Sequence, residues 1–248
     1  KIQLKLTHSI EVMKITVTQK MWAEYMGKNP AEHANGIGSL RLNIHGQSIR
    51  MNPDHPVENI TWWSAVAFAN KVSEAFGFKP AYDLSSISFK SDTSAEDGTF
   101  YDNADNPRHD NQAKIVAPKG DIYKAEGFRL PTEAELDYLY TFANRVKKSE
   151  LTNHVWWAGN SDYTTHPVLE KTFQIGDILG NVSEWAHDND DWFQSGGVNP
   201  RGLKIGDMRT VRGGSWADDK RLLTTSRSSK LPRQRESTIG FRLVRTLK

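Results

Sequence analysis

The sequence of 248 residues lacks cysteine. This absence excludes disulfides, metal sites with thiolate ligands and cysteine nucleophiles. Long apolar runs are also absent, since no stretch approaches the roughly 18 consecutive apolar residues of a membrane-spanning helix. The opening residues, KIQLKLTHSIEVMKITVTQ, contain no apolar signal-peptide core, and the chain begins with Lys1 rather than Met. We therefore expect a processed or trimmed segment upstream of Lys1, where any lipid anchor would also lie.

The composition is that of a folded chain with an uneven distribution of charge. Hydrophobic residues make up 37% of the sequence and aromatic residues 10%, enough to build a core. The net charge is only +2, yet residues 201–248 hold 13 Lys or Arg and 4 Asp or Glu. This basic stretch is either a solvated face or a surface for acidic partners. From Arg221 to Arg235 no aromatic residue interleaves the five basic residues as a stacking platform, so we do not expect a nucleic-acid partner.

Two helices are predicted in the first third of the chain. The first covers residues 21–26, follows a strand over residues 12–17, and would end at Gly27. The second covers residues 61–76, where an apolar stripe follows Thr61 as the N-cap. Both helices present large aromatic side chains on one face, so we expect them to pack against the core.

The third predicted helix starts at a capping box. The side chains of Thr132 and Glu135 can each reach the backbone amide of the other residue. Residues 29–56 are rich in turn formers and are predicted as loop, and residues 83–127 are predicted as an insertion that can form a β-hairpin. After Asn144 only short strands and turns are indicated. Because no internal repeat or composition shift marks a boundary, we predict one α+β domain over the whole chain.

Arginines near the helix start and the C-terminus are expected to be structural. Arg129 and Glu133 stand at the start of the third helix, where a cap with a buried ion pair or hydrogen-bond network is predicted. A guanidinium suits fixed polar contacts because its rigid fork can satisfy several acceptors at once. Further arginines of this kind are Arg212, Arg227, Arg235 and Arg242. The two glycines of RGGSW allow backbone conformations that a Cβ would block.

Five ordered motifs carry a resemblance to a known family. They are EVMKITVTQKMWAEYMG, HPVENITWWSAVAFANKVSE, GFRLPTEAELDYLY, DILGNVSEWAHD, and the closing pair VRGGSW and GFRLV. These motifs span roughly residues 8–246 and resemble the formylglycine-generating enzyme / sulfatase-modifying factor family. The resemblance implies a C-type-lectin-like fold with a mixed β-core, two main helices and much irregular chain. It does not by itself transfer a function.

The residues that the oxidases of this family use are not present. Those enzymes carry two cysteines shortly after the Gly-Gly-Ser-Trp/Tyr motif, and the matching positions here are Asp218 and Leu223. Neither side chain can supply a thiolate, so copper-dependent thiol chemistry is excluded. The iron-dependent branch uses a His-rich helix motif, but the eight histidines here show no His-x3-His spacing. His187 is left as an isolated candidate ligand.

The resemblance also implies a structural calcium site in DILGNVSEW. In the family this loop ligates Ca²⁺ through the residues that match Asp177 and Glu184 and the carbonyls that match Gly180 and Val182. Carboxylate and carbonyl oxygens are the hard ligands that calcium prefers. The alternative is a turn held by Asn and Glu hydrogen bonds without a metal. No catalytic cofactor is expected.

A second group shares this frame and lacks the cysteines: the variable proteins of diversity-generating retroelements. Their final residues follow the pattern RGGSW…R…P…R…GFR, and the positions between vary. The matching frame residues here are Arg212 to Trp216, Arg227, Pro232, Arg235 and Gly240 to Arg242. The resemblance implies that the residues between them bind a ligand. These candidates are Ala217, Asp218, Asp219, Lys220, Arg221, Leu223, Ser226, Ser228, Ser229, Lys230, Arg233, Gln234, Glu236, Ser237 and Thr238.

Two classes of function remain open. The first is a non-catalytic monomer, displayed at the cell surface or in the periplasm as an outer-membrane lipoprotein, whose residues 217–238 bind a macromolecular ligand such as a protein. The second is a maturation enzyme or accessory factor of the same family that uses non-thiol chemistry. A flat, exposed polar face at residues 217–238 favours the first class, and a cluster of metal ligands in a cleft favours the second. The segment can also be plain polar surface on a catalytically inactive homologue.

Overall fold

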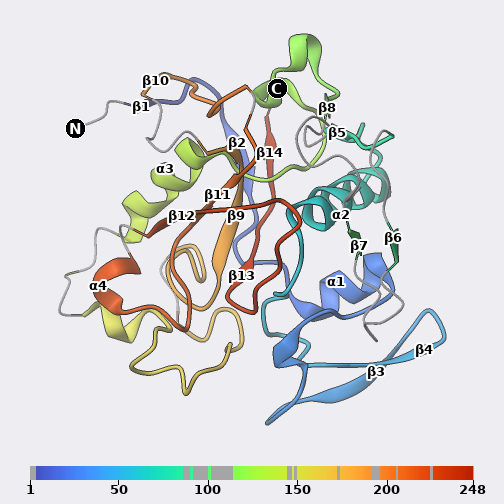
Figure 1. The fold of residues 1–248 in the computed structure, drawn as a ribbon, viewed down its shortest axis with the longest axis vertical. Helices are drawn as coiled ribbons and strands as arrows, with labels where there is room; N and C mark the ends of the chain where they lie inside the picture. The colour runs from blue at the N-terminus through green and yellow to red at the C-terminus, as the bar shows by residue number, and fades with distance from the viewer. Residues whose placement is uncertain are drawn as a thin grey trace.

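A four-stranded sheet forms the centre of the molecule in the computed structural model (Figure 1). Its strand order is β12 (Arg227–Lys230), β11 (Arg209–Arg212), β9 (Ser183–Asn189) and β13 (Ile239–Gly240). β11 runs antiparallel to both β12 and β9, whereas β13 runs parallel to β9. The structure describes residues 4–85, 90–91, 100–101, 114–143, 147, 150–171, 174–190, 196–204, 206–223 and 226–247. The RGGSW motif starts at Arg212, the last residue of β11, so the sheet fixes the position at which the motif begins.

Pairs of short strands complete the β-structure in the described residues. They are β1 (Leu4–Lys5) with β10 (Gly197–Val198), β2 (Ile10–Val12) with β14 (Val244–Thr246), β3 (Leu40–Ile44) with β4 (Gln47–Met51), β5 (Tyr82–Asp83) with β8 (Lys114–Ile115), and β6 (Lys90–Ser91) with β7 (Phe100–Tyr101). β2 and β14 join the beginning and the end of the chain in an antiparallel pair. This arrangement is the mixed α+β fold that the sequence predicts.

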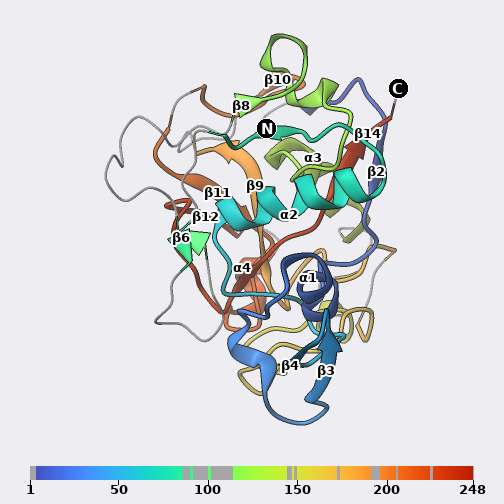
Figure 2. The same cartoon turned by 90° about the vertical axis from the view of Figure 1, so that its right-hand side faces the viewer.

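Helices lie on two sides of the central sheet in Figure 1. α1 (Gln19–Met26) and α2 (Trp62–Ala75) lie on one side, and α3 (Glu133–Ala143) and the short α4 (Lys220–Leu223) lie on the other. Figure 2 shows α2 crossing in front of the sheet when the molecule is turned. Single 3₁₀ turns are η1 (Glu32–Ala34), η2 (Pro118–Gly120), η3 (Ile122–Lys124) and η4 (Leu151–Asn153).

The predicted caps are confirmed. Thr61 accepts a hydrogen bond from an amide in the first turn of α2, and Gly27 ends α1 with a φ of 78°. Thr18 caps α1 in the same way, which was not predicted, and this helix begins at Gln19 rather than at residue 21. In α3 the amide of Glu135 donates to Thr132 Oγ1 at 3.2 Å, and the amide of Thr132 donates to Glu135 Oε2 at 2.8 Å. These reciprocal bonds satisfy amides that the helix itself leaves without acceptors.

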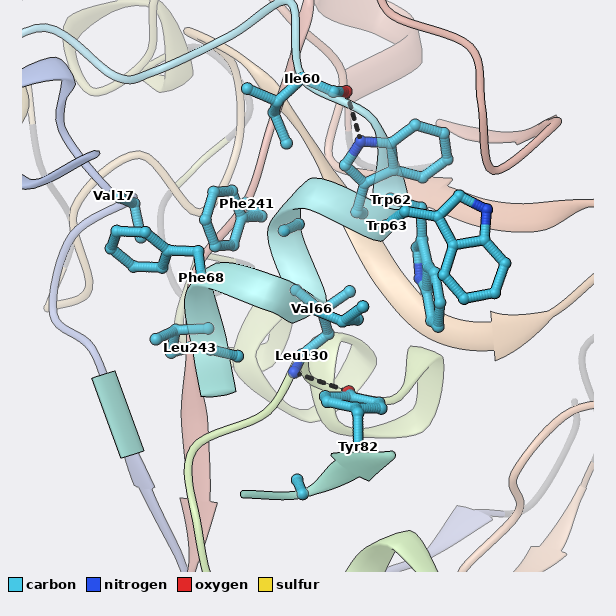
Figure 3. Close-up of a cluster of buried hydrophobic side chains, with 14 of the residues drawn as sticks. Val17, Ile60, Trp62, Trp63, Val66, Phe68, Tyr82, Leu130, Phe241 and Leu243 are labelled. Atoms are coloured by element: carbon cyan, nitrogen blue, oxygen red, sulfur yellow. Dashed lines mark hydrogen bonds between the residues drawn. The ribbon is translucent and has the colours of Figure 1, made fainter. Parts of the chain in front are cut away.

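The main hydrophobic core lies between α2 and the sheet (Figure 3). Trp62, Trp63 and Phe68 of α2 are at most 2% exposed and pack with Trp185 of β9 and with Phe241. A second cluster joins α3 to the loop before β9 and to α4. Burial of apolar surface at roughly 25 cal/mol per Å² makes these aromatic clusters the main source of stability. Val211 and Phe241, at the two ends of the C-terminal segment, therefore belong to the core.

Residues 29–56 differ from the prediction of a loop. They contain η1 and the antiparallel hairpin of β3 and β4. His45 and Gly46 form its turn with positive φ angles of 51° and 83°, which is the conformation of a two-residue type I′ turn. Apolar residues alternate with polar ones in LRLNI and QSIRM, a pattern that indicates strands. The many turn-forming residues around them led to the prediction of a loop. The first strand also ends at Val12, earlier than expected.

Most of the predicted insertion over residues 83–127 lies outside the described residues. Where the chain is described, β5 and β8 pair at the base of the segment and β6 pairs with β7. No helix among the described residues has both the length and the apolar character needed to span a membrane.

Candidate functional site

Buried ion pairs fix the ends of the C-terminal segment. Glu133, at the first turn of α3, accepts from Arg212 at 2.7 Å and from Arg227 at 2.7 Å. Arg212 also reaches Asp137, and Arg227 also reaches Asp190, each at 2.7 Å. One carboxylate thereby links the end of β11 to the start of β12. The helix N-terminus further favours this negative charge.

Two more buried arginines hold the frame. Arg129 makes a bidentate pair with Glu135, with both distances at 2.8 Å. Arg242 pairs with Glu184 at 2.6 Å and also donates to the carbonyl of Gly176. The prediction of fixed polar contacts is confirmed for these residues, although the partner of Arg129 is Glu135 rather than Glu133. Arg129 holds the pKa of Glu135 well below its ordinary value, against the opposing effect of burial.

The segment between the frame residues is held mainly through its backbone. Carbonyls along it accept hydrogen bonds of 2.8 to 3.0 Å from backbone amides elsewhere in the chain. These bonds join Asp218 to Ala158, Pro232 to Trp62, Glu236 to Asn59, and Thr238 to Ser183. The β11–β12 ladder and the Trp216 indole, which donates to the Ser237 carbonyl at 3.0 Å, hold the rest. Because backbone groups make these contacts, these hydrogen bonds do not depend on which side chains the acceptor residues carry.

The candidate ligand-binding residues divide by exposure. The exposed members are Ala217, Lys220, Arg221, Ser228, Arg233 and Gln234, and the half-buried members are Asp218, Asp219, Ser226, Ser229, Lys230, Glu236, Ser237 and Thr238. We call the exposed set the ligand face. It carries three cationic side chains, of which Arg221 is paired with Asp219 at 2.9 Å. The structure therefore brings a basic, polar set to the surface around α4 and β12.

Several half-buried candidates also have structural contacts. Asp218 Oδ2 accepts from the amide and the hydroxyl of Ser215, at 2.8 and 2.7 Å. Lys230 pairs with Glu236 at 2.5 Å, and Ser229 donates to Asp190. Substitutions at these positions are expected to cost more stability than substitutions on the ligand face.

Leu223 is a correction to the predicted surface set. Its side chain is 1% exposed and belongs to the hydrophobic cluster of α3. Gly214 has a φ of 68°, and a Cβ at this position would lie 2.5 Å from Leu223 Cδ2. α4 thus packs directly on the glycine pair of the frame. Leu223 anchors this helix and cannot contact a ligand at the surface.

A group of histidines and tryptophans beside the frame was not predicted. His33 lies against Trp216 with ring centroids 5.1 Å apart, and His166 stacks on Trp156 at 3.6 Å. His55 faces His166 at 6.5 Å. Burial, and then the charges of the two neighbouring histidines, lower the pKa of His55 to about 4, so it is neutral at pH 7. These residues come from distant segments, and no sequence spacing signals their meeting.

The loop before β9 contains a buried carboxylate. Asp177 is 1% exposed, and neither of its oxygens has a donor within ordinary hydrogen-bond geometry among the described residues, although the Asn181 side chain and the Leu169 backbone lie beside it. A buried carboxylate without donors suits a cation. Glu184, in contrast, already has both oxygens bonded to Arg242. Asp177 therefore fits the predicted site, whereas Glu184 would have to divide its oxygens between the ion and Arg242.

His187 lies in a buried position that does not resemble a metal site. Its Nδ1 is 3.3 Å from the Tyr82 hydroxyl. Burial, together with Arg209 and Arg129, lowers the pKa of His187 well below its ordinary value. Within the described part of the chain, no group of three or more His, Asp or Glu side chains is placed to hold a metal ion.

The fold and the frame together define the class of protein. The family model of the sulfatase-modifying factor enzyme 1-like domain matches residues 2–247, so the chain belongs to this family. Its fold is C-type-lectin-like, as the sequence resemblance implies. The sequence has none of the cysteines on which the oxidases of the family depend.

Three solved structures are similar to this chain. Treponema denticola variable protein 1 superposes with a TM-score of 0.75 at 28% identity, over 98% of this chain and 86% of that chain. CarF gives a TM-score of 0.57 at 25% identity, over 96% and 87% of the two chains. PvdO from Pseudomonas aeruginosa gives 0.58 at 18% identity, over 96% and 80%, and shows the fold alone.

One curated relative extends beyond this chain. Chaperone protein LppX of Paenibacillus barcinonensis is 26% identical over 199 residues. The match covers 70% of this chain and 60% of the relative, so the chain spans less than two thirds of that protein.

Proposed function

We propose that this protein is a non-catalytic binding protein whose exposed side chains within residues 217–238 contact a macromolecular ligand. The observation that carries the proposal is the separation of contacts in this segment. Backbone hydrogen bonds and buried arginines hold its path, while the ligand face points to solvent. Exposed substitutions usually change stability by only about ±0.5 kcal/mol. A surface of this kind can change its specificity at little cost to folding.

The proposal extends to a variable protein diversified by a retroelement. The similarity to Treponema denticola variable protein 1 supports it, since that relative covers 98% of this chain. The cationic residues of the ligand face favour a ligand with an acidic surface, because complementary charge increases the rate of association. We further propose that the ligand is a protein and that this chain is a monomer displayed at the cell surface or in the periplasm.

An accessory role in maturation is the alternative. The name of the curated relative, Chaperone protein LppX, favours it, because a chaperone acts on another protein without a redox centre of its own. The variable-protein function and the accessory function both need a surface that binds a macromolecule. They differ in whether the amino acids of that surface are constant or vary between copies of the protein.

The DNA that flanks the coding sequence distinguishes the two. A diversified protein predicts a near-copy of the region encoding residues 212–242 beside a reverse-transcriptase gene. In that copy, adenines should coincide with the codons of the ligand face. A constant C-terminal coding region in independent isolates, with no such copy nearby, contradicts the variable-protein proposal and leaves the accessory role.

We also propose that Asp177 supplies a carboxylate to a structural Ca²⁺, with the carbonyls of Gly180 and Val182 as further ligands. Its buried oxygens, which lack donors within ordinary hydrogen-bond geometry, support this ligand role. The ion would stabilise the loop between α3 and β9 and would take no part in binding at the ligand face.

A further inference from the structure

A basic cavity lies at the end of β9, away from the ligand face. It has a volume of about 850 Å³, within the roughly 300–1,000 Å³ typical of sites for small molecules. Residues 114, 115, 119, 120 and 122 and residues 196 and 199–204 line its walls, near β8 and β10 at the top of Figures 1 and 2. No residue of the ligand face lines it.

The floor of the cavity contains a fixed buried cation. Arg209 is 4% exposed, and its guanidinium carbon lies 3.7 Å from the centroid of the Trp62 ring. Its Nη1 also donates to the His187 carbonyl at 2.7 Å. Burial lowers the pKa of Arg209 to about 10, so the group is still protonated at neutral pH. A cation that is already held in place loses little entropy when an anion binds.

The walls add further positive charge. Lys114, Lys119 and Lys204 are exposed and line the cavity together with Arg201. Among the described residues, no Asp or Glu lines it. Asp121 pairs with Arg201 at 3.2 Å, and Asp83 lies opposite Lys114 in the β5–β8 pair. Among the described residues, the five lining cations outnumber these two carboxylates and Asp188, whose charge acts on Arg209.

We propose that this cavity is a second binding site, which takes a small molecule with phosphate or several carboxylate groups. Arg209 contacts the anion at the floor, and the lysines surround it at the walls. A planar guanidinium and several ammonium groups around one concave space match both kinds of oxyanion. The site is distinct from the ligand face because the two share no residue, although Arg209 lies opposite Lys230 in the β11–β12 pair.

Isothermal titration calorimetry with the whole chain tests this site. Inorganic pyrophosphate and citrate are titrated separately at fixed ionic strength, so that the two arms distinguish phosphate from carboxylate recognition. We expect saturable binding of at least one of these probes. The double variant Lys114→Glu/Lys204→Glu should weaken it by about tenfold or more, because two cations near the anion become repulsive.

A matched control separates local from overall charge. Lys14→Glu/Lys20→Glu changes the net charge equally at exposed lysines outside the cavity. It should leave the affinity within about twofold, because screening limits distant exposed charges. Equal weakening by both double variants, or no saturable binding of either probe to the parent protein, overturns the proposal. Neither result depends on whether the ligand face binds a protein.

Discussion

At the scale of single residues, buried carboxylates differ in what neutralises them. Glu133, Glu135 and Glu184 are each paired with arginine. Asp188 accepts the amide of Glu133 at 2.7 Å. At Asp177 the Asn181 side chain and the Leu169 backbone approach the carboxylate, but the described residues supply no donor within ordinary hydrogen-bond geometry. The removal of a charge from water costs several kcal/mol unless a partner compensates. The ionisation state of Asp177 should therefore depend on whether a cation is bound beside it.

The pH dependence of stability tests the role of Asp177. Burial raises its pKa from 3.8 to about 7, so without metal the folded state holds this proton at pH values where the unfolded chain has lost it. Stability of the metal-free protein should therefore fall as the pH rises from about 4 to 7. Asp177→Asn cannot ionise and should lack this part of the loss. Urea midpoints across this range, measured in a chelator, check the comparison.

Added calcium should reverse that loss in the parent protein, because the ion binds the ionised carboxylate. It should have no such effect on Asp177→Asn. If urea midpoints of the parent protein are the same in calcium and in chelator at every pH, the proposed calcium site is wrong.

At the scale of elements, two side-chain caps and one glycine made the helices predictable. Thr61 and Thr132 mark the starts of α2 and α3, and Gly27 marks the end of α1. The Thr18 cap of α1 was not predicted. The β3–β4 hairpin was not predicted, because its His-Gly turn lies within a segment rich in turn formers. Leu223 packs against Gly214 from α4, a helix of only four residues. A helix this short shows no apolar periodicity in the sequence, so the contact was not predicted.

The glycine of the DILGN loop provides a prediction at this scale. Gly180 and Gly27 have nearly equal φ angles of 76° and 78°, but only Gly180 is crowded. A Cβ there would lie 2.3 Å from the Trp156 carbonyl oxygen, whereas a Cβ at Gly27 meets nothing within 4 Å. Gly27→Ala should cost about 1–2 kcal/mol from backbone conformation alone. Gly180→Ala should cost about 1–3 kcal/mol more, because backbone must move.

Chemical denaturation of the two alanine variants measures this difference, since the backbone strain is nearly the same in both. Equal losses of unfolding free energy would mean that the loop adapts freely. The close contact between Gly180 and Trp156 would then not hold the entry to β9.

At the scale of the whole molecule, the C-terminal segment combines a fixed path with a free surface. Its ends are buried with the aromatic core and the arginine–carboxylate pairs, which the order of motifs in the sequence indicates. Its middle was predicted only in part, because six of the fifteen candidate side chains are exposed, eight are half-buried and Leu223 is buried. Contacts between distant segments determine three features that the sequence does not predict. These are the partner of each arginine, the burial of Leu223 and the basic cavity.

The central claim is that side chains of the ligand face do not determine the fold. A library randomised at Ala217, Lys220, Arg221, Ser228, Arg233 and Gln234 tests it most directly, with the fraction of protease-resistant members as the readout. The control library randomises the same number of frame positions: Arg212, Gly213, Gly214, Trp216, Arg227 and Arg242. We predict that most ligand-face members fold with melting temperatures within a few degrees of the parent, whereas few frame members fold. Equal intolerance in the two libraries would contradict the account.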